Sequence, residues 1–374
     1  MKTEIIQVMA GAAVLSAFTY LPILARDTLG ADEFYITLIV SAYAVAAFTS
    51  SYIFGRAGDI YGRRIVLRVG LFLSMLSFGL LMIPMSLELL FLARVLNGFC
   101  IGMYPGALAA YAFESNMKMG RFASFGALGW GAGTVVAGYA AGFNIYWAFL
   151  VSAAFFVVAF GSAFTLPKIQ VKSIRVPLFP VETFKRNYPV YLAVYIRHSS
   201  AFAVWVFWPL FLLDLGGDLF IIGLIQATNA IAQVIFMIGL TDRFDCSKLI
   251  TVGLGASAAT FAWISMATTV WDLFPSQVLL GFAWACLYVG SLKYVTERNV
   301  ERSTASGLLQ SSLSIAGVVG PIYAGILFAL WASYIPIILF AALMSVVALI
   351  IFYFSNRGTE CSIEGFQSIE ILQN

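Results

Sequence analysis

Charged, histidine and cysteine residues are scarce in this sequence. Only 10% of its 374 residues are Asp, Glu, Lys or Arg, whereas 61% are hydrophobic. A soluble protein carries about 25% charged residues, so this chain has too little polar surface to cover a globule in water. A membrane protein needs less polar surface, because lipid surrounds most of its outside. The composition therefore predicts an integral membrane protein.

Residues that could hold a metal or a cofactor are equally sparse. The four cysteines lie far apart without a Cys-x-x-Cys spacing, and the chain has one histidine. This pattern favours neither a zinc site nor a disulfide framework. The run Gly129-x-Gly131-x-Gly133 follows no strand-like segment, so it does not indicate a nucleotide-binding loop. We therefore expect no metal, no cofactor, no nucleic-acid partner and no enzymatic activity.

Long apolar runs make up most of the chain. A membrane-spanning helix needs about 20 mostly apolar residues, and the charged, Pro and Gly clusters divide the sequence into twelve such runs. In the first half they are 5–24, 35–54, 66–84, 89–112, 122–143 and 145–166, and in the second half 190–213, 219–240, 249–269, 273–295, 304–328 and 333–355. The predicted fold is all-α, with a six-helix bundle at 1–167, a basic linker at 168–189, a second bundle at 190–355 and a tail at 356–374.

The basic residues are distributed unevenly over the predicted loops. Of the 21 Lys and Arg residues, only Arg26 falls in a loop on the side opposite the N-terminus, and only Arg94 and Arg197 fall inside spans. Loops on the cytoplasmic side of membrane proteins carry the excess of Lys and Arg. This asymmetry predicts a multi-pass protein of the cell membrane with both termini in the cytoplasm.

The two halves of the sequence resemble each other. Matches occur at a nearly constant offset: Tyr20-Leu21-Pro22, Asp27 and Leu29-Gly30 correspond to Phe207-Trp208-Pro209, Asp214 and Leu215-Gly216, and Arg94 and Gly98 correspond to Gln277 and Gly281. Such a pattern indicates duplication of a six-helix unit. Copies in the same orientation are related by an axis along the membrane normal, with a solute path between them.

Two short motifs stand at corresponding places in the halves. Gly55, Asp59, Gly62, Arg63 and Arg64 lie between the second and third spans, and a shorter version with Gly239, Asp242 and Arg243 lies between spans eight and nine. Arg94-x-x-x-Gly98 with Pro105 occupies the fourth span. With twelve spans in two halves, these motifs make the chain resemble the major facilitator superfamily of secondary transporters over essentially its whole length.

The resemblance implies alternating access, in which two bundles rock about a central site and perform no chemistry on the substrate. It also implies that the Gly55–Arg64 loop, with Asp242 and Arg243, gates the cytoplasmic side. Glycines let helix ends approach closely, and an aspartate beside arginines can form an ionic latch. The alternative is a plain turn that carries cytoplasmic positive charge.

A few charged or titratable residues fall within the spans. A charge at the bilayer centre costs about 2.5–3.5 kcal/mol on insertion scales, so Arg94 and Arg197 should face a cavity or a partner. Arg94 could instead extend towards the lipid headgroups. His198 titrates near neutrality, which makes protons a candidate coupling ion, although a lone histidine is more often a packed hydrogen-bonding residue. Because Arg197 and His198 are neighbours, they point about 100° apart on a helix, and we expect them to face different surroundings.

Amide side chains form a stripe in the eighth span. Gln226, Asn229 and Gln233 recur at helical spacing on one face, and Gln310 in span eleven is a weaker candidate of the same kind. They either line the substrate cavity or hydrogen-bond a neighbouring helix.

The sequence therefore predicts a secondary active transporter of a small solute. Many aromatic residues and few fixed charges favour gradient-driven export of a hydrophobic or amphipathic compound. The alternatives are ion-coupled uptake of a neutral polar solute, such as a sugar or a nucleoside, and a non-transporting membrane sensor or scaffold. The expected partners are the substrate and the lipid bilayer. The oligomeric state stays open and is compatible with a monomer.

Overall fold

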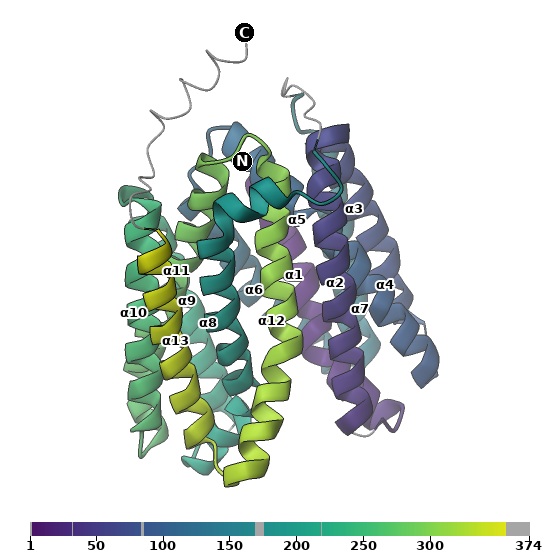
Figure 1. Cartoon of the computed structure of the whole chain (residues 1–374). Helices are drawn as coiled ribbons and strands as arrows, with labels where there is room; N and C mark the ends of the chain where they lie inside the picture. The colour runs from purple at the N-terminus through teal and green to yellow at the C-terminus, as the bar shows by residue number, and fades with distance from the viewer. Residues whose placement is uncertain (1, 32, 84–85, 169–175, 218, 357–374) are drawn as a thin grey trace.

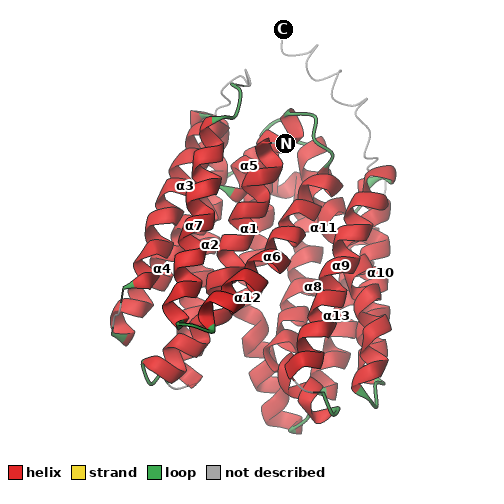
Figure 2. Cartoon of the chain, turned by 180° about the vertical axis from the view of Figure 1, so that it is seen from behind, coloured by secondary structure: helices red, strands yellow, loops and turns green. Residues whose placement is uncertain are grey.

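The computed structural model describes residues 2–31, 33–83, 86–168, 176–217 and 219–356, and within these ranges the chain contains helices and no strands (Figure 2). The helices of the first half are α1 (Lys2–Ile23), α2 (Glu33–Tyr61), α3 (Arg63–Gly79), α4 (Leu87–Met103), α5 (Pro105–Glu114), α6 (Met119–Ala141) and α7 (Ile145–Phe164). Those of the second half are α8 (Val181–Asp214), α9 (Leu219–Gly239), α10 (Cys246–Ser265), α11 (Leu273–Glu297), α12 (Arg302–Trp331) and α13 (Ile335–Ser355). Single turns of other helix types occur at η1 (Leu24–Thr28), η2 (Leu80–Met82), η3 (Thr241–Arg243) and η4 (Val270–Asp272).

These helices confirm the twelve predicted spans. The span predicted at 89–112 contains both α4 and α5, because the chain bends between them at Tyr104 and Pro105. Proline has no backbone N–H to donate and is favoured at the first position of a helix, so a new helix begins there. Ten of the spans are long and apolar enough to cross a membrane by length and composition, and Leu224–Gly239 is a shorter apolar helix.

The helices run side by side, and their ends gather at two faces of the molecule (Figure 1). α1 begins and α13 ends at the face that is uppermost in Figure 1. Arg63, Arg186, Lys248 and Arg302 lie at helix ends on this face. We call it the basic end.

The two halves meet mainly at α12 and at α9. α12 packs against α2 and α5, and α9 packs against α6. α2 and α12 cross so closely that a Cβ atom built on Gly307 would lie 2.7 Å from the Cα of Gly55 and 2.7 Å from the backbone oxygen of Ser51. Small residues at such a crossing let two backbones approach. Glycine at 55 and 307 therefore brings the two halves into contact near the basic end.

The segment Gly55–Arg64, predicted to be a loop, is helical for most of its length. α2 continues to Tyr61, α3 begins at Arg63, and only Gly62 separates them, with a φ of 98° that favours glycine. The prediction was wrong because charged residues ended the apolar run before they ended the helix. The linker boundary also differs, since α8 begins at Val181, inside the segment 168–189.

The described cysteines include both free and disulfide-bonded residues. Cys100 and Cys286 are free and buried. Cys246 is disulfide-bonded, so the expectation that no cysteine is paired was wrong at this position.

Candidate functional site

A cavity of about 570 Å³ lies between the two halves. Its wall is built from α1, α2 and α6 of the first half and from α8 to α12 of the second. A second cavity of about 220 Å³ shares Tyr43, Trp130, Tyr288 and Gln310 with it and extends to Ser306, closer to the start of α12. The larger cavity is therefore continuous with a smaller one on the side of the basic end.

Arg197 and His198 of α8 both line the larger cavity. The His198 ring stacks on Trp284 with ring centroids 4.9 Å apart, and the Arg197 guanidinium lies over the same indole at 5.4 Å. The expectation that these neighbours face different surroundings was wrong. The long arginine side chain reaches round to the ring that the histidine contacts directly.

The predicted amide stripe also lines this cavity. Gln226, Asn229 and Gln233 of α9 all contribute to its wall. Gln233 Nε2 donates to Asn229 Oδ1 at 2.6 Å, and Asn229 Nδ2 donates to the backbone oxygen of Gln277 at 3.2 Å. The Gln233 Oε1 and Gln277 Nε2 atoms are buried without a hydrogen-bond partner. The amide stripe thus forms a hydrogen bond to a neighbouring helix, and buried polar atoms of Gln233 and Gln277 remain without a partner.

Arg94 lies beside the cavities and lines neither of them, as far as the described residues show. It is 1% exposed, so it does not reach the headgroup region. Its guanidinium carbon stands 4.1 Å from the centre of the Tyr43 ring, and Tyr43 lines both cavities. Arg94 therefore contacts the cavity wall through an aromatic side chain.

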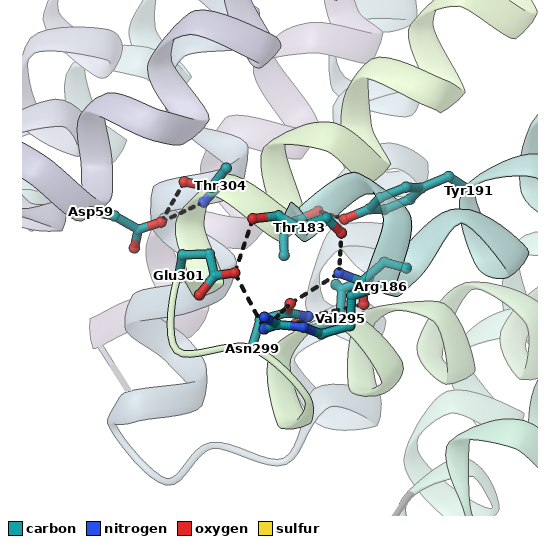
Figure 3. A network of polar contacts seen from close by, with 10 residues as sticks. Asp59, Thr183, Arg186, Tyr191, Val295, Asn299, Glu301 and Thr304 are labelled. Carbon is teal, nitrogen blue, oxygen red and sulfur yellow. Dashed lines mark hydrogen bonds and ion pairs between the residues drawn. The ribbon is translucent and has the colours of Figure 1, made fainter. Parts of the chain in front are cut away.

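Asp59 joins the two halves at the basic end (Figure 3). Its carboxylate accepts from Arg63 Nη2 at 3.0 Å, within the first half. It also accepts from the backbone N–H groups of Ser303 and Thr304 at 3.2 and 2.7 Å, and from Thr304 Oγ1 at 2.6 Å. Backbone N–H groups in the first turn of a helix lack internal partners, and the helix dipole favours negative charge there. Asp59 of α2 thus satisfies the first turn of α12.

Glu114, at the end of α5, extends this contact. Arg63 forms an ion pair with Glu114, and Arg302 Nη1 lies 3.6 Å from Glu114 Oε1. One carboxylate therefore neutralises an arginine from each half. The side chains of Asp59, Arg63 and Glu114 are between 0% and 8% exposed, so water screens these charges little. We call Asp59, Arg63, Glu114 and the first turn of α12 the latch.

The other basic and acidic motif residues are not part of the latch, as far as the described side chains show. The Nε atom of Arg64 is buried without a hydrogen-bond partner. Arg243 is exposed at the end of η3, and the side chain of Asp242 lies outside the described part of the chain. The structure therefore brings Asp59 and Arg63 together, and among the described side chains Arg243 forms no ion pair with either of them.

The first turns of α8 hold the loop between α11 and α12 (Figure 3). Thr183 Oγ1 donates to Glu301 Oε1 at 2.9 Å, and Arg186 Nη1 lies 3.3 Å from the same oxygen. Asn187 and Asn299 exchange two amide hydrogen bonds of 3.0 Å each. These contacts fix the start of α8 to the second half.

The residues just before α8 bond instead to the first half. Arg56 Nε donates to the backbone oxygen of Val176 at 2.6 Å, and Tyr52 OH donates to that of Leu178 at 3.0 Å. Both donors belong to α2. The chain therefore passes from a contact with one half to a contact with the other within a few residues.

Several site residues were not among the sequence candidates. Gln277 entered only as the counterpart of Arg94 in the repeat, and that correspondence was the available signal. Tyr43 and Tyr288 line both cavities, yet nothing in the sequence distinguishes them from other aromatic residues. Among the described residues, no group of three or more His, Cys, Asp or Glu side chains could hold a metal ion.

Comparison with known proteins identifies the family. The sequence profile of the Major Facilitator Superfamily matches residues 5–196 and 190–362. This chain belongs to the Major Facilitator Superfamily. The superfamily consists of membrane transporters, and the two bundles around a central cavity agree with that membership.

Other members of the superfamily match most of the chain. It is 23% identical over 353 residues to the tetracycline resistance protein, class B, of Escherichia coli, which covers 85% of this chain and 86% of that protein. It is 25% identical over 342 residues to the multi-drug resistance efflux pump PmrA of Streptococcus pneumoniae serotype 4, with coverage of 84% and 85%. The crystal structure of the human organic anion transporter MFSD10 (TETRAN) superposes with a TM-score of 0.80 at 14% identity, covering 94% and 98% of the two chains.

Proposed function

We propose that this chain exports hydrophobic or amphipathic compounds across the cell membrane by alternating access, driven by an ion gradient. The cavity between the halves carries the argument, because aromatic and aliphatic side chains form most of its wall. Ligand sites of this kind combine a mainly apolar lining with a few placed polar groups. The relatives named as resistance and efflux proteins support export over solute uptake and over a sensor or scaffold role.

The basic end is the cytoplasmic side in this proposal. The positive-inside rule supports that orientation, since nearly all loop Lys and Arg residues belong to this face. With the latch formed, the cytoplasmic side is closed, and the conformer presents its cavity towards the outside. The latch must then break for a substrate to enter from the cytoplasm. Protons are the coupling ion that we propose, with His198 as the titratable group on the cavity wall.

The test is dye accumulation in bacteria that lack their own efflux pumps. Cells expressing the chain should retain less of an amphipathic fluorescent dye than cells with an empty vector, and a protonophore should abolish the difference. The matched control is Ser314→Trp, which fills the region where the two cavities meet. Equal dye content in all three strains, with equal membrane expression, would refute the proposal.

A further inference from the structure

One guanidinium provides the charge of the larger cavity. Of the described residues that line it, Arg197 alone carries a full charge. The residue is fully buried, and no ion pair joins it to a described carboxylate. A buried cation without a counter-ion is expensive, so such groups usually have a charged partner.

Only one of the three guanidinium nitrogens of Arg197 forms a hydrogen bond. Nε donates to Ser257 Oγ at 3.0 Å, whereas Nη1 and Nη2 have no acceptor. The guanidinium lies over the rings of Phe261 and Trp284, 5.6 and 5.4 Å from their centres. The aromatic rings and Ser257 hold the group in place, and its two terminal nitrogens are buried without an acceptor. These nitrogens can form paired hydrogen bonds with a carboxylate.

A cluster of aromatic side chains adjoins the guanidinium. Trp284 stacks with His198 at 4.9 Å and with Tyr288 at 5.3 Å, at interplanar angles of 19° and 14°. Phe202 and Trp205 meet the His198 ring edge-on at 4.9 and 5.4 Å. Aromatic ligands pack against such clusters. The cavity thus places aromatic side chains beside a cation.

We infer that the preferred ligand class is a planar aromatic carboxylate, with its ring against the aromatic cluster around Trp284 and its carboxylate on Nη1 and Nη2 of Arg197. This inference rests on the proposed function and specifies its substrate class. An organic cation of equal size would meet Arg197 with the same sign of charge and would find no acidic group among the described lining residues. A neutral amide would keep the stacking and lose the charge-assisted bonds.

The inference can be tested by binding alone. The purified full chain in lipid nanodiscs is titrated with 2-naphthoate, 2-naphthamide and 2-naphthylmethylammonium, and binding is followed by calorimetry. The three probes share a ring and differ in charge. We expect naphthoate to bind about 10- to 100-fold more tightly than the other two, as for a charge-assisted hydrogen bond. Equal affinities, or tighter binding of the ammonium probe, would overturn the inference.

Variants assign the preference to one side chain. Arg197→Gln should bring the ratio of naphthoate affinity to naphthamide affinity close to one, whereas Arg197→Lys should retain part of the advantage. If Arg197→Gln does not fold, Gln277→Glu provides an independent test, because it adds a carboxylate to the same cavity wall. This variant should weaken naphthoate binding and strengthen binding of the ammonium probe. An unchanged order of affinities in the folded variants would contradict the inference.

The binding assay and the dye-export assay distinguish a failure of this inference from a failure of the proposed function. Dye export without a preference for naphthoate would overturn this inference and leave the proposed function standing. A naphthoate preference without any transport would support the site and refute export.

Discussion

The crossing of α2 and α12 gives the sharpest prediction. Gly307→Ala adds one methyl group at a place where a Cβ would lie 2.7 Å from the Cα of Gly55 and 2.7 Å from the backbone oxygen of Ser51. Non-bonded carbon atoms prefer about 3.5–4.0 Å, so the helices must separate by about 1 Å. Both neighbours are backbone atoms, and no side-chain rotation can relieve the contact. The methyl group therefore opposes the closed basic end.

The size of the effect follows from the cost of overpacking. An extra methyl group in a closely packed contact costs about 1–3 kcal/mol. Because the clash exists only while α2 and α12 touch, this cost falls on the closed state. It should shift the equilibrium towards an open basic end by about 5- to 150-fold.

Spin labels at the basic end measure this shift. Lys118 precedes α6 in the first half, Lys248 lies in the first turn of α10 in the second half, and both are exposed. Cysteines are placed at these two positions in a chain whose native cysteines have been replaced, and each is spin-labelled. Pulsed electron paramagnetic resonance then records the distribution of distances between the two labels. Gly307→Ala should increase the fraction of molecules in which the two spin labels lie far apart. The control is Gly325→Ala on the same helix, where an added Cβ has no neighbour within 4 Å. Identical distributions for the two variants would refute the reasoning.

Three further variants test the other contacts. Asp59→Asn removes the charge that binds the first turn of α12, so the long-distance population should rise about tenfold or more; unchanged distances and transport would exclude a latch role. Asn187→Ala breaks two buried hydrogen bonds with Asn299 and should destabilise the fold by about 1–3 kcal/mol, seen as a lower Tm; an unaltered melting curve would contradict this. Trp284→Ala removes the surface that stacks on Tyr288, so dye export should fall while the spin-label distances stay the same; full export would show that the ring is not part of the binding surface.

The fold could largely be predicted from the sequence, because a helix that crosses lipid must be apolar over most of its length and therefore appears as a long apolar run. The repeat and the charge asymmetry then predict two bundles and the face on which the basic residues gather. The extent of α2 was harder to predict, since Arg56 and Asp59 interrupt the apolar run and not the hydrogen bonds of the helix. Span boundaries at the basic end therefore shifted most.

The site could be predicted only in part. Gln226, Asn229 and Gln233 were found because three amides on one helical face are conspicuous in an apolar span. The partners of Asp59 could not be found, since two of them are backbone N–H groups of α12, and a backbone group has no signature in the sequence. The position of Arg94 depends on the rotation of α4, which an all-round apolar helix does not reveal.

The connection between the halves limits how far the basic end can open. Leu178 is bonded to α2, and α8 is fixed to the second half from Thr183 onwards. The chain from Leu178 to Val181 reaches at most about 11 Å when fully extended. A wider separation has to release the bond from Tyr52 or unwind the first turn of α8. Opening beyond this length is therefore coupled to release of the Tyr52 bond or to unwinding of α8, and because the acceptor on Leu178 is a backbone oxygen, this contact tolerates side-chain changes at that position.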